Sequence, residues 1–366
     1  MTPRWRAAAG AVRPLPADGE AQARARLDRL TKPRGSLGRL EDLAARVAAL
    51  QGTDRPVAAP AAVFVFAADH GVAADGVSAY PQVVTREMIK NFIKGGAAVN
   101  ALARAAGAEV VVVDVGVAGD PFGAPGAEVA GPGGRLLCRR VRPGSASLLG
   151  GPALTPADVE AALDVGAALA AEAAGAHLRV AAVGDMGIGN TTPAAAVVAA
   201  LLGLPPERTV GRGTGVDDAG LGRKRAAVAA GLSRLGPRAV DPLAVLAEVG
   251  GLEIAAMAGF LLGAAAARLP VVLDGVVTGA AALAAARLAP AAADGWIAAH
   301  RSPEPAHGAV LDALRLRPLL DLEMRLGEGS GACLGLGLVA AACRMLREMA
   351  TFEEAEVSEA PGEPGR

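Results

Sequence analysis

The stretch from Gly184 to Ala195, read GDMGIGNTTPAA, combines residue types that can hold an anion. An apolar run of strand length, residues 178–183, precedes it, and a long Ala/Val/Leu segment typical of a helix follows. Gly187 and Gly189 permit backbone conformations that a Cβ would block, and Thr192 before a proline is typical of a helix N-cap. Such a turn offers unpaired backbone N–H groups to a phosphate or carboxylate. Taken alone, the pattern also fits a well-capped turn in an α/β core.

A second candidate for chemistry is Glu328, which lies between Gly327 and Gly329 at the start of a Gly/Ala-rich segment. One interpretation is a surface carboxylate stabilised by the dipole of the helix that follows. The other is a general base in a close-fitting apolar site, where burial would raise the pKa of the carboxyl group. The spacing alone leaves both open.

Several other chemistries lack their motifs. The P-loop pattern GxxxxGK[ST] is absent, and the dinucleotide pattern GxGxxG occurs only in degraded form at 211–216, with Val216 in place of the third glycine. The Gly-Ser-Gly at 329–331 is not a GxSxG nucleophile elbow. Four histidines form no HExxH pair, and three cysteines have no metal-ligand spacing. We therefore expect no metal, no cofactor and no ATP- or NAD-type site.

The elements that must position these residues form a repeated strand–loop–helix pattern. We expect strands at 61–68, 108–116, 178–183, 269–273 and 295–299. A helix is expected over 84–104, with Thr85 as its N-cap and Gly95-Gly96 as a weak point or a close-packing site. Thr278 is expected to cap a later helix. The Gly/Pro-rich residues 118–152 fit a loop or hairpin. The pattern predicts an α/β fold with a parallel sheet flanked by helices, in an undetermined strand order.

Each predicted strand is followed by polar or glycine-containing residues. Parallel sheets bind ligands at the carboxyl ends of their strands, so these residues predict one lined pocket. They are Asp69-His70-Gly71, Asp114-Val115-Gly116, the loop 184–192, Asp274-Gly275 and His300-Arg301-Ser302.

Composition excludes some classes of partner. Of 366 residues, 52% are apolar and only 2% aromatic, so the core must be built from Ala, Val and Leu. The net charge of −1, without a basic cluster, argues against a nucleic-acid partner. Charged residues and proline interrupt the most apolar region, 252–290, so no membrane span is expected. Residues 1–16 lack the apolar run of a signal peptide, and the odd cysteine count favours reduced thiols in the cytoplasm.

Eight motifs occur in an order that resembles one known family. They are DHGV at 69–72, GVSAYP at 76–81, GGAAVN at 95–100, GDMGIGNTTPAAA from 184, GRGTG at 211–215, GGLEIAAMAG at 250–259, HRSPEP at 300–305 and RLGEGSGA at 325–332. Together they resemble the nicotinate-nucleotide:dimethylbenzimidazole phosphoribosyltransferases of cobalamin biosynthesis. The resemblance covers about residues 31–349.

The resemblance implies an activity and an architecture. Nicotinate mononucleotide and 5,6-dimethylbenzimidazole would give α-ribazole 5′-phosphate and nicotinate, without a metal. A homodimer is implied, in which an α/β domain is joined by a small helical domain built from both chain ends. The boundaries would be 1–55 and 323–366 for the two helical segments, and 56–322 for the α/β domain.

The resemblance also implies roles for individual residues. Glu328 would be the general base. The phosphoribosyl group would meet Asp185, Gly187, Ile188, Gly189, Asn190, Thr191, Lys224, Asp274 and Ser302. The benzimidazole would meet Tyr80, Glu87, Met186 and Leu326. Asp185 stands where the family usually has Glu, and Glu87 stands where it often has Gln.

Two other functions remain open from the sequence. The same transfer could use a different aromatic acceptor, such as adenine or a phenol. The chain could also bind the nucleotide without catalysing a reaction, although the presence of the candidate base weakens this hypothesis.

Overall fold

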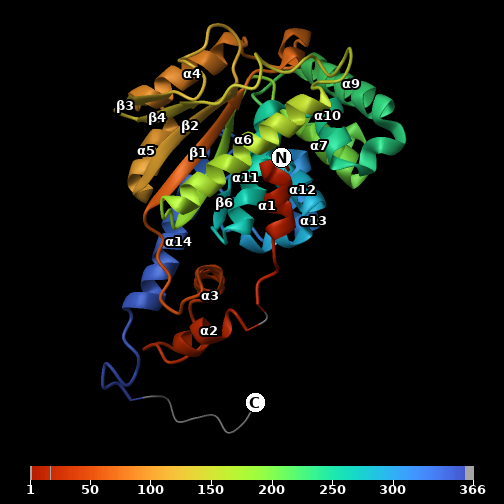
Figure 1. Cartoon of the computed structure of the whole chain (residues 1–366). Coiled ribbons are helices and arrows are strands. Elements are labelled where there is room, and N and C mark those ends of the chain that lie inside the picture. The colour runs from red at the N-terminus through yellow and green to blue at the C-terminus, as the bar shows by residue number, and fades with distance from the viewer. Residues whose placement is uncertain (1, 17, 359–366) are drawn as a thin grey trace.

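The computed structural model describes residues 2–16 and 18–358, and in this part of the chain seven strands form one sheet (Figure 1). Its order is β3-β4-β2-β1-β5-β6-β7, and all neighbouring pairs are parallel except β3–β4. The strands are β1 (Ala61–Ala68), β2 (Ala108–Gly116), β3 (Glu128–Gly131), β4 (Gly134–Cys138), β5 (Val180–Met186), β6 (Val271–Leu273) and β7 (Trp296–Ala298). The predicted parallel α/β sheet is confirmed, and the hairpin in the Gly/Pro-rich region extends it by β3 and β4.

Helices connect the strands and cover both faces of the sheet (Figure 1). They are α1 (Arg4–Ala11), α2 (Ala21–Leu27), α3 (Arg39–Gln51), α4 (Val83–Lys94), α5 (Ala98–Ala106), α6 (Pro156–Gly175), α7 (Thr191–Leu202), α8 (Pro206–Thr209), α9 (Asp218–Leu235), α10 (Pro242–Val249), α11 (Leu252–Ala266), α12 (Val276–Leu288), α13 (Pro305–Leu314) and α14 (Ser330–Glu348), with 3₁₀ turns η1 (Gly71–Asp75), η2 (Gly236–Val240) and η3 (Pro290–Gly295).

The strand order places a topological switch between β1 and β5. From β1 the chain builds outward through β2 and β4, and then it returns to the other side of β1 with β5, β6 and β7. Connections leave the sheet in opposite directions at such a point, which opens a crevice at the carboxyl ends of the two strands. The loops after Ala68 and Met186 lie at this crevice, because Ala67 pairs with Met186 in the sheet register.

The two faces of β1 pack against different helices. Phe64 and Phe66 face the layer that contains α6, α7, α11 and α12, and both rings contact Phe260 of α11, at centroid distances of 4.7 and 5.7 Å. Val63 and Val65 face the layer that contains α4, α5 and α14. A strand buried on both faces reads as a continuous apolar run, which is why this segment could be recognised from the sequence.

Small residues allow the helices to approach closely. A Cβ on Gly166 of α6 would collide with the Ala256 carbonyl oxygen of α11, and one on Gly259 of α11 would collide with the Leu163 carbonyl oxygen of α6. The Ala- and Gly-rich composition therefore produces backbone contact between helices rather than interdigitated aromatic side chains.

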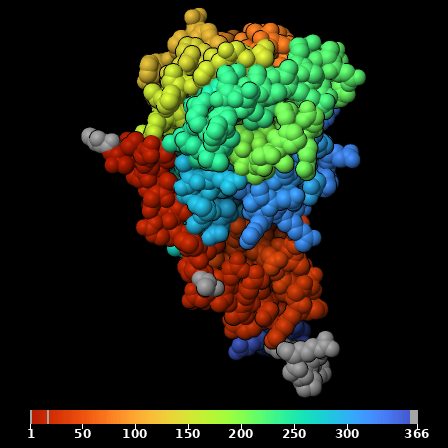
Figure 2. Space-filling model, turned by 90° about the vertical axis from the view of Figure 1, so that its right-hand side faces the viewer, coloured from red at the N-terminus to blue at the C-terminus, as the bar shows by residue number. Residues whose placement is uncertain are grey.

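The two ends of the chain meet below the sheet. Helices α2 and α3 lie beside the last turns of α14, and Figure 2 shows the residues that follow α1 in the narrower lower part of the molecule. The Arg26 Nε donates to the Leu346 carbonyl oxygen at 2.9 Å, and the buried Lys32 and Glu41 form an ion pair at 2.9 Å. In contrast, α1 packs on α6 and α11, where the Trp5 ring N–H donates to Glu160 at 2.6 Å. The division at residues 55 and 322 stays a prediction.

Helix α14 meets the length and hydropathy of a membrane span, with 56% of its apolar window buried in the fold. It packs against α3, α5 and β5, and its buried residues belong to the second face of the sheet. Its apolar character is therefore that of a core helix in this structure.

The structure corrects four local expectations. The predicted helix over 84–104 is two helices, because Gly95 adopts a left-handed φ of +87° between α4 and α5. Thr85 lies inside α4, and Thr192 lies inside α7, which has Asn190 at its N-cap position. Thr278 lies inside α12, and its hydroxyl donates to the Gly275 carbonyl oxygen at 2.9 Å instead of capping a free N–H.

Candidate active site

The backbone around Glu328 is unusual. Gly327, Glu328 and Gly329 all have positive φ values, +84°, +63° and +81°. Glycine adopts this region freely, whereas a residue with a Cβ is strained there. The two flanking glycines therefore let the chain turn sharply before α14 and place the Glu328 side chain inside the molecule.

The Glu328 carboxyl group is buried and forms no ion pair with any residue in the described part of the chain. The residue is 7% exposed, and its Oε2 has no hydrogen-bond partner among the residues that the structure describes. Burial, together with the negative charge of Asp274, raises the pKa of Glu328 to about 7. The surface interpretation of this residue is therefore wrong, and its carboxyl group can change protonation state near neutral pH.

Asp274 fixes the start of α14. Its two oxygens accept hydrogen bonds from the backbone N–H groups of Gly329 at 3.1 Å and Ala332 at 3.0 Å. These are first-turn donors of the helix, which lack partners within the helix itself. The neighbouring His300 approaches Asp274 at 3.6 Å and lies so close to Gly331 that a Cβ there would collide with its ring. Asp274 thus holds the backbone that carries Glu328.

A buried cation lies near the ends of β5 and β6. Lys224 of α9 is 1% exposed, and its Nζ donates to the Thr191 hydroxyl at 2.8 Å. Burial lowers the pKa of Lys224 to about 8, partly offset by the charge of Glu304. Gly213 lies against both groups, because a Cβ there would be 2.6 Å from the Thr191 hydroxyl and 2.9 Å from the Lys224 Nζ. A buried ammonium beside a hydroxyl is suited to hold a phosphate.

Glu304 secures the glycine loop that covers this cation. Its Oε1 accepts from the Gly213 N–H at 2.9 Å, and a Cβ on Gly211 would collide with its other oxygen. The Ser302 hydroxyl accepts from the Glu304 N–H at 3.4 Å. The Arg325 guanidinium donates to the Gly213 carbonyl oxygen at 3.4 Å. The loop 211–215 is therefore held by side chains from two separate segments.

In the Gly-rich turn after β5, more backbone N–H groups have hydrogen-bond partners than the sequence suggested. The Ile188 N–H donates to the Thr85 hydroxyl at 3.0 Å, and the Asn190 N–H donates to the Gly187 carbonyl oxygen at 3.0 Å. The prediction of unpaired N–H groups is thus wrong for these two. Asn190 instead offers its side chain, whose amide donates to Asp185 at 2.7 Å. Burial and the charge of Asp274 raise the pKa of Asp185 to about 8.

A second buried pair supports the same turn from the β1 side. The His70 Nε2 lies 2.8 Å from the Glu253 carboxylate, and both side chains are fully buried. Burial alone would lower the pKa of His70, and the charge and hydrogen bond of Glu253 outweigh it and raise that pKa. A Cβ on Gly187 would lie only 3.2 Å from the His70 ring.

One cavity of about 70 Å³ brings many of the predicted residues together. Of the predicted site residues, Asp185, Asn190, Thr191, Ser302 and Leu326 line it, as do His300, Glu304 and Arg325. A cavity of this size suits a group as small as a phosphate rather than a whole nucleotide. Lys224 does not line the cavity itself, but it contacts Thr191 and Gly213, which do. Asp274 does not line the cavity either, because its carboxylate accepts the hydrogen bonds from Gly329 and Ala332.

The residues predicted to hold the base are more dispersed. Leu326 is 58% exposed at the rim of the cavity, and Tyr80 is 55% exposed. Glu87 is exposed on α4, and Met186 is buried among apolar side chains of the second face. Of these four, only Leu326 lines the cavity in the single chain, and their roles stay predictions.

Sequence reasoning gave no role to Glu304 or Arg325; it gave His300 only a place in the predicted pocket lining, and Thr85 only that of a helix N-cap. The first three lie in motifs that carried the resemblance, but nothing in their spacing shows which loop they contact. The closely spaced glycines at 211 and 213 were the available signal for Glu304, because both accommodate its carboxylate.

Comparison with known proteins agrees with this geometry. The family described as "Phosphoribosyltransferase" matches residues 12–357. A nicotinate-nucleotide–dimethylbenzimidazole phosphoribosyltransferase from Chloroflexus aggregans is 52% identical over 348 residues, which span 95% of this chain and 96% of the relative. One from Thermus thermophilus is 55% identical over 338 residues, 92% of this chain and 98% of the relative. The crystal structure of CobT from Thermus thermophilus superposes with a TM-score of 0.87, covering 94% of this chain and 100% of that one at 54% identity.

The family match over residues 12–357, together with the α/β sheet, places the chain among the phosphoribosyltransferases. More narrowly, the chain belongs to the family of nicotinate-nucleotide–dimethylbenzimidazole phosphoribosyltransferases.

Proposed function

We propose that this chain transfers the phosphoribosyl group of nicotinate mononucleotide to 5,6-dimethylbenzimidazole, with Glu328 as the general base. The products are α-ribazole 5′-phosphate and nicotinate. The observation that carries the proposal is the buried Glu328 carboxyl group, one oxygen of which has no hydrogen-bond partner among the described residues. The neighbouring Gly327 lines the cavity, and the buried Lys224 contacts Thr191 of the same lining.

Glu328 meets the chemical need of the acceptor. One imidazole nitrogen attacks C1 of the ribose through its lone pair, and the ring then carries positive charge. The proton on its other nitrogen must leave, and a carboxylate with a pKa of about 7 can accept it at neutral pH. Nicotinate departs with a neutral ring nitrogen, so the leaving group needs no acid.

The phosphate end of the substrate is held by Lys224, Thr191, Asn190 and Ser302. Lys224 supplies the charge, and its pKa of about 8 rises when a dianionic phosphate binds beside it. Asp185 is protonated at pH 7 because its pKa is about 8, so it adds no negative charge to the phosphate site.

In the proposed transfer the acceptor attacks C1 from the face opposite nicotinate. A phosphate held at Lys224 and a flat base held near Leu326 and Glu328 support this arrangement, because they fix the two ends of the reacting pair. Attack from that face inverts the anomeric carbon and converts a β-nucleotide into an α-product. Holding both reactants in this geometry supplies a large part of the rate acceleration.

The proposal includes a cytoplasmic homodimer. Apolar side chains that are exposed in the single chain, among them Val83, Leu322 and Leu326, favour a partner subunit near the rim of the cavity. Cys138, Cys333 and Cys343 are all free and buried, as suits a reducing compartment.

Competition between acceptors tests the substrate. Purified protein is incubated with nicotinate mononucleotide and equal amounts of dimethylbenzimidazole, adenine and a phenol, and the products are separated and their anomeric configuration is read by NMR. We expect α-ribazole phosphate to dominate. A dominant adenine or phenol product would favour the alternative acceptor, and nucleotide binding without any product would favour a non-catalytic protein.

A further inference from the structure

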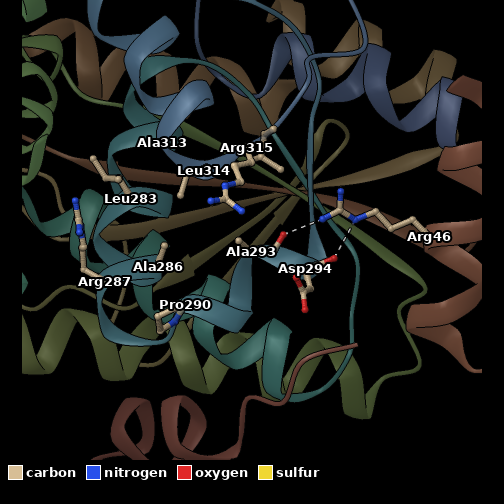
Figure 3. Close-up of a pocket in the computed structure, with 11 residues that line it drawn as sticks. Arg46, Leu283, Ala286, Arg287, Pro290, Ala293, Asp294, Ala313, Leu314 and Arg315 are labelled. Carbon is tan, nitrogen blue, oxygen red and sulfur yellow. Dashed lines mark hydrogen bonds between the residues drawn. The ribbon is translucent and has the colours of Figure 1, made fainter. Parts of the chain in front are cut away.

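A larger cavity lies at the opposite edge of the sheet from Glu328. It encloses about 670 Å³ between α3, the last turns of α12 and α13, and η3 (Figure 3). Helix α12 contributes Val276, its first residue, to the active-site cavity and Arg287, about 17 Å further along the helix axis, to this one. A ligand bound in this cavity therefore does not overlap the phosphoribosyl site.

The cavity is lined by more positive than negative charge. Arg46, Arg287 and Arg315 contribute three guanidinium groups, and Asp294 contributes the one carboxylate of the lining. Asp294 accepts a hydrogen bond from the Leu15 N–H at 3.1 Å and forms no ion pair with any described residue. The lining thus has a formal excess of two positive charges.

The hydrogen bonds of these arginines leave their charge largely uncompensated. Arg46 donates to the carbonyl oxygens of Ala293 and Asp294, both at 3.0 Å, and Arg287 donates to the Leu201 carbonyl oxygen at 2.8 Å. Within residues 2–16 and 18–358 the Arg315 side chain makes no hydrogen bond and no ion pair. In Figure 3 its guanidinium lies among the lining residues, between Leu283 and Ala293. Burial lowers the pKa of Arg46, and the nearby charge of Asp294 offsets this only in part.

Favourable interaction with a helix C-terminus explains only some of the arginines that line this cavity. An arginine at a helix C-terminus interacts favourably with the last carbonyl groups, which accounts for a residue such as Arg287. Arg315 follows α13 with a φ of +54°, a position that favours glycine. Its backbone N–H donates to the Asp312 carbonyl oxygen at 3.1 Å, whereas its guanidinium donates to no carbonyl oxygen of the described residues. Its side chain is therefore available to a ligand.

We propose that this cavity binds a phosphorylated small molecule of nucleotide size. A guanidinium group matches the oxygens of a phosphate and stays charged at any physiological pH. The remaining walls are apolar, formed by Leu283, Ala286, Pro290, Ala313, Leu314 and Leu316. A volume of this size is that of a small-molecule pocket and exceeds what a free phosphate would fill. The ligand thus has an anionic group near Arg315 and an apolar or flat body against the leucines.

The test is calorimetric titration of the full chain with ADP at low ionic strength, with adenosine as the uncharged probe. Arg315→Gln removes the unpaired guanidinium. Arg317→Gln is the matched control, because Arg317 is also exposed and lies two residues away, outside the cavity lining. We expect ADP to bind the wild-type chain and the Arg317→Gln variant alike, and Arg315→Gln to weaken that binding at least tenfold. Adenosine should bind much more weakly than ADP.

Arg287→Gln provides a second variant. This substitution should also weaken ADP binding, because Arg287 lines the cavity. Thermal unfolding checks that each variant is folded. Absence of ADP binding, or equal binding by the wild type and Arg315→Gln, would overturn the proposal. Equal weakening in the Arg315 and Arg317 variants would show a diffuse electrostatic effect and overturn it too. A change of oligomeric mass in Arg315→Gln, with ADP binding unaltered, would assign the cavity to an interface between copies instead.

Discussion

At the scale of single residues, two titrating groups define the candidate site. Glu328 needs to lose a proton before it can act as a base, and Lys224 needs to keep one in order to hold a phosphate. Burial moves both pKa values toward neutrality from opposite directions, to about 7 and about 8. Shifted pKa values of this kind cluster at functional sites, where a single protonation state is required of each group.

The pH dependence of kcat/KM follows from these two groups. Below pH 7 the deprotonated fraction of Glu328 falls about tenfold per pH unit, so the rate falls with it. Above pH 8 Lys224 loses its charge, so binding of the mononucleotide weakens. We expect a bell-shaped profile with a maximum between pH 7 and 8. Lys224→Met should remove the descending limb, and a flat profile in the wild type would contradict both roles.

Removal of the Lys224 ammonium group should weaken the binding of nicotinate mononucleotide. Lys224→Met keeps the apolar stem and loses the ammonium group, so KM for nicotinate mononucleotide should rise at least about tenfold, as expected for a charged hydrogen bond. Arg223→Met is the control, because the neighbouring arginine is exposed and bonds the Gly76 carbonyl oxygen. Equal effects of the two substitutions in steady-state kinetics would rule out a specific phosphate contact.

At the scale of elements, the start of α14 positions the base. Three consecutive left-handed residues turn the chain, and Asp274 binds two of the N–H groups that begin the helix. The fit between this turn and its neighbours is tight. A Cβ on Gly184 of β5 would collide with the Gly329 nitrogen, and one on Gly331 would collide with the His300 ring. The position of Glu328 therefore depends on the absence of side chains around it.

Alanine substitutions at two glycines of α14 separate the effect of this tight fit from the effect of helix propensity. Gly331→Ala forces the helix away from His300 and should lower the free energy of unfolding by about 1–3 kcal/mol and reduce activity. Gly337→Ala, on the exposed face with open space around it, should raise that free energy by about 0.5–1 kcal/mol and leave activity unchanged. Urea unfolding and initial rates measure both. A Gly331→Ala variant as stable and active as the wild type would disprove the tight fit.

These elements also show how far the sequence could lead. The buried strand 61–68 was readable, because its signal, a continuous apolar run, is local. The sequence predicted Thr85 and Thr192 as helix N-caps, but both lie inside their helices. Thr85 bonds a loop 103 residues away, and such long-range contacts outweigh a local preference. Glu328 was found from its two glycines, whereas its burial required the whole fold.

At the scale of the molecule, the strand order places the site. The switch between β1 and β5 brings together loops that lie more than 100 residues apart, and α14 adds Glu328 to the same edge. The segments from the two chain ends gather at the other edge, around α2 and α3 (Figure 1). The helical segments of a single chain therefore leave the rim near Leu326 exposed.

The oligomeric state should reflect this exposed rim. We expect light scattering to give twice the 36.2 kDa mass of the chain, because burial of the apolar rim side chains by a second copy removes them from water. Charged substitutions of Val83 and Leu322 together should shift the protein toward the single-chain mass. A fully active protein with the mass of one chain at assay concentration would contradict the homodimer.

The central claim is that Glu328 is the base of a phosphoribosyl transfer. It is tested most directly by chromatography of the products from nicotinate mononucleotide and dimethylbenzimidazole, for the wild type and for Glu328→Gln. The wild type should release equal amounts of α-ribazole phosphate and nicotinate, and the variant should fold normally and lose about 10²-fold or more of the rate. A folded Glu328→Gln variant with the rate of the wild type would contradict the account.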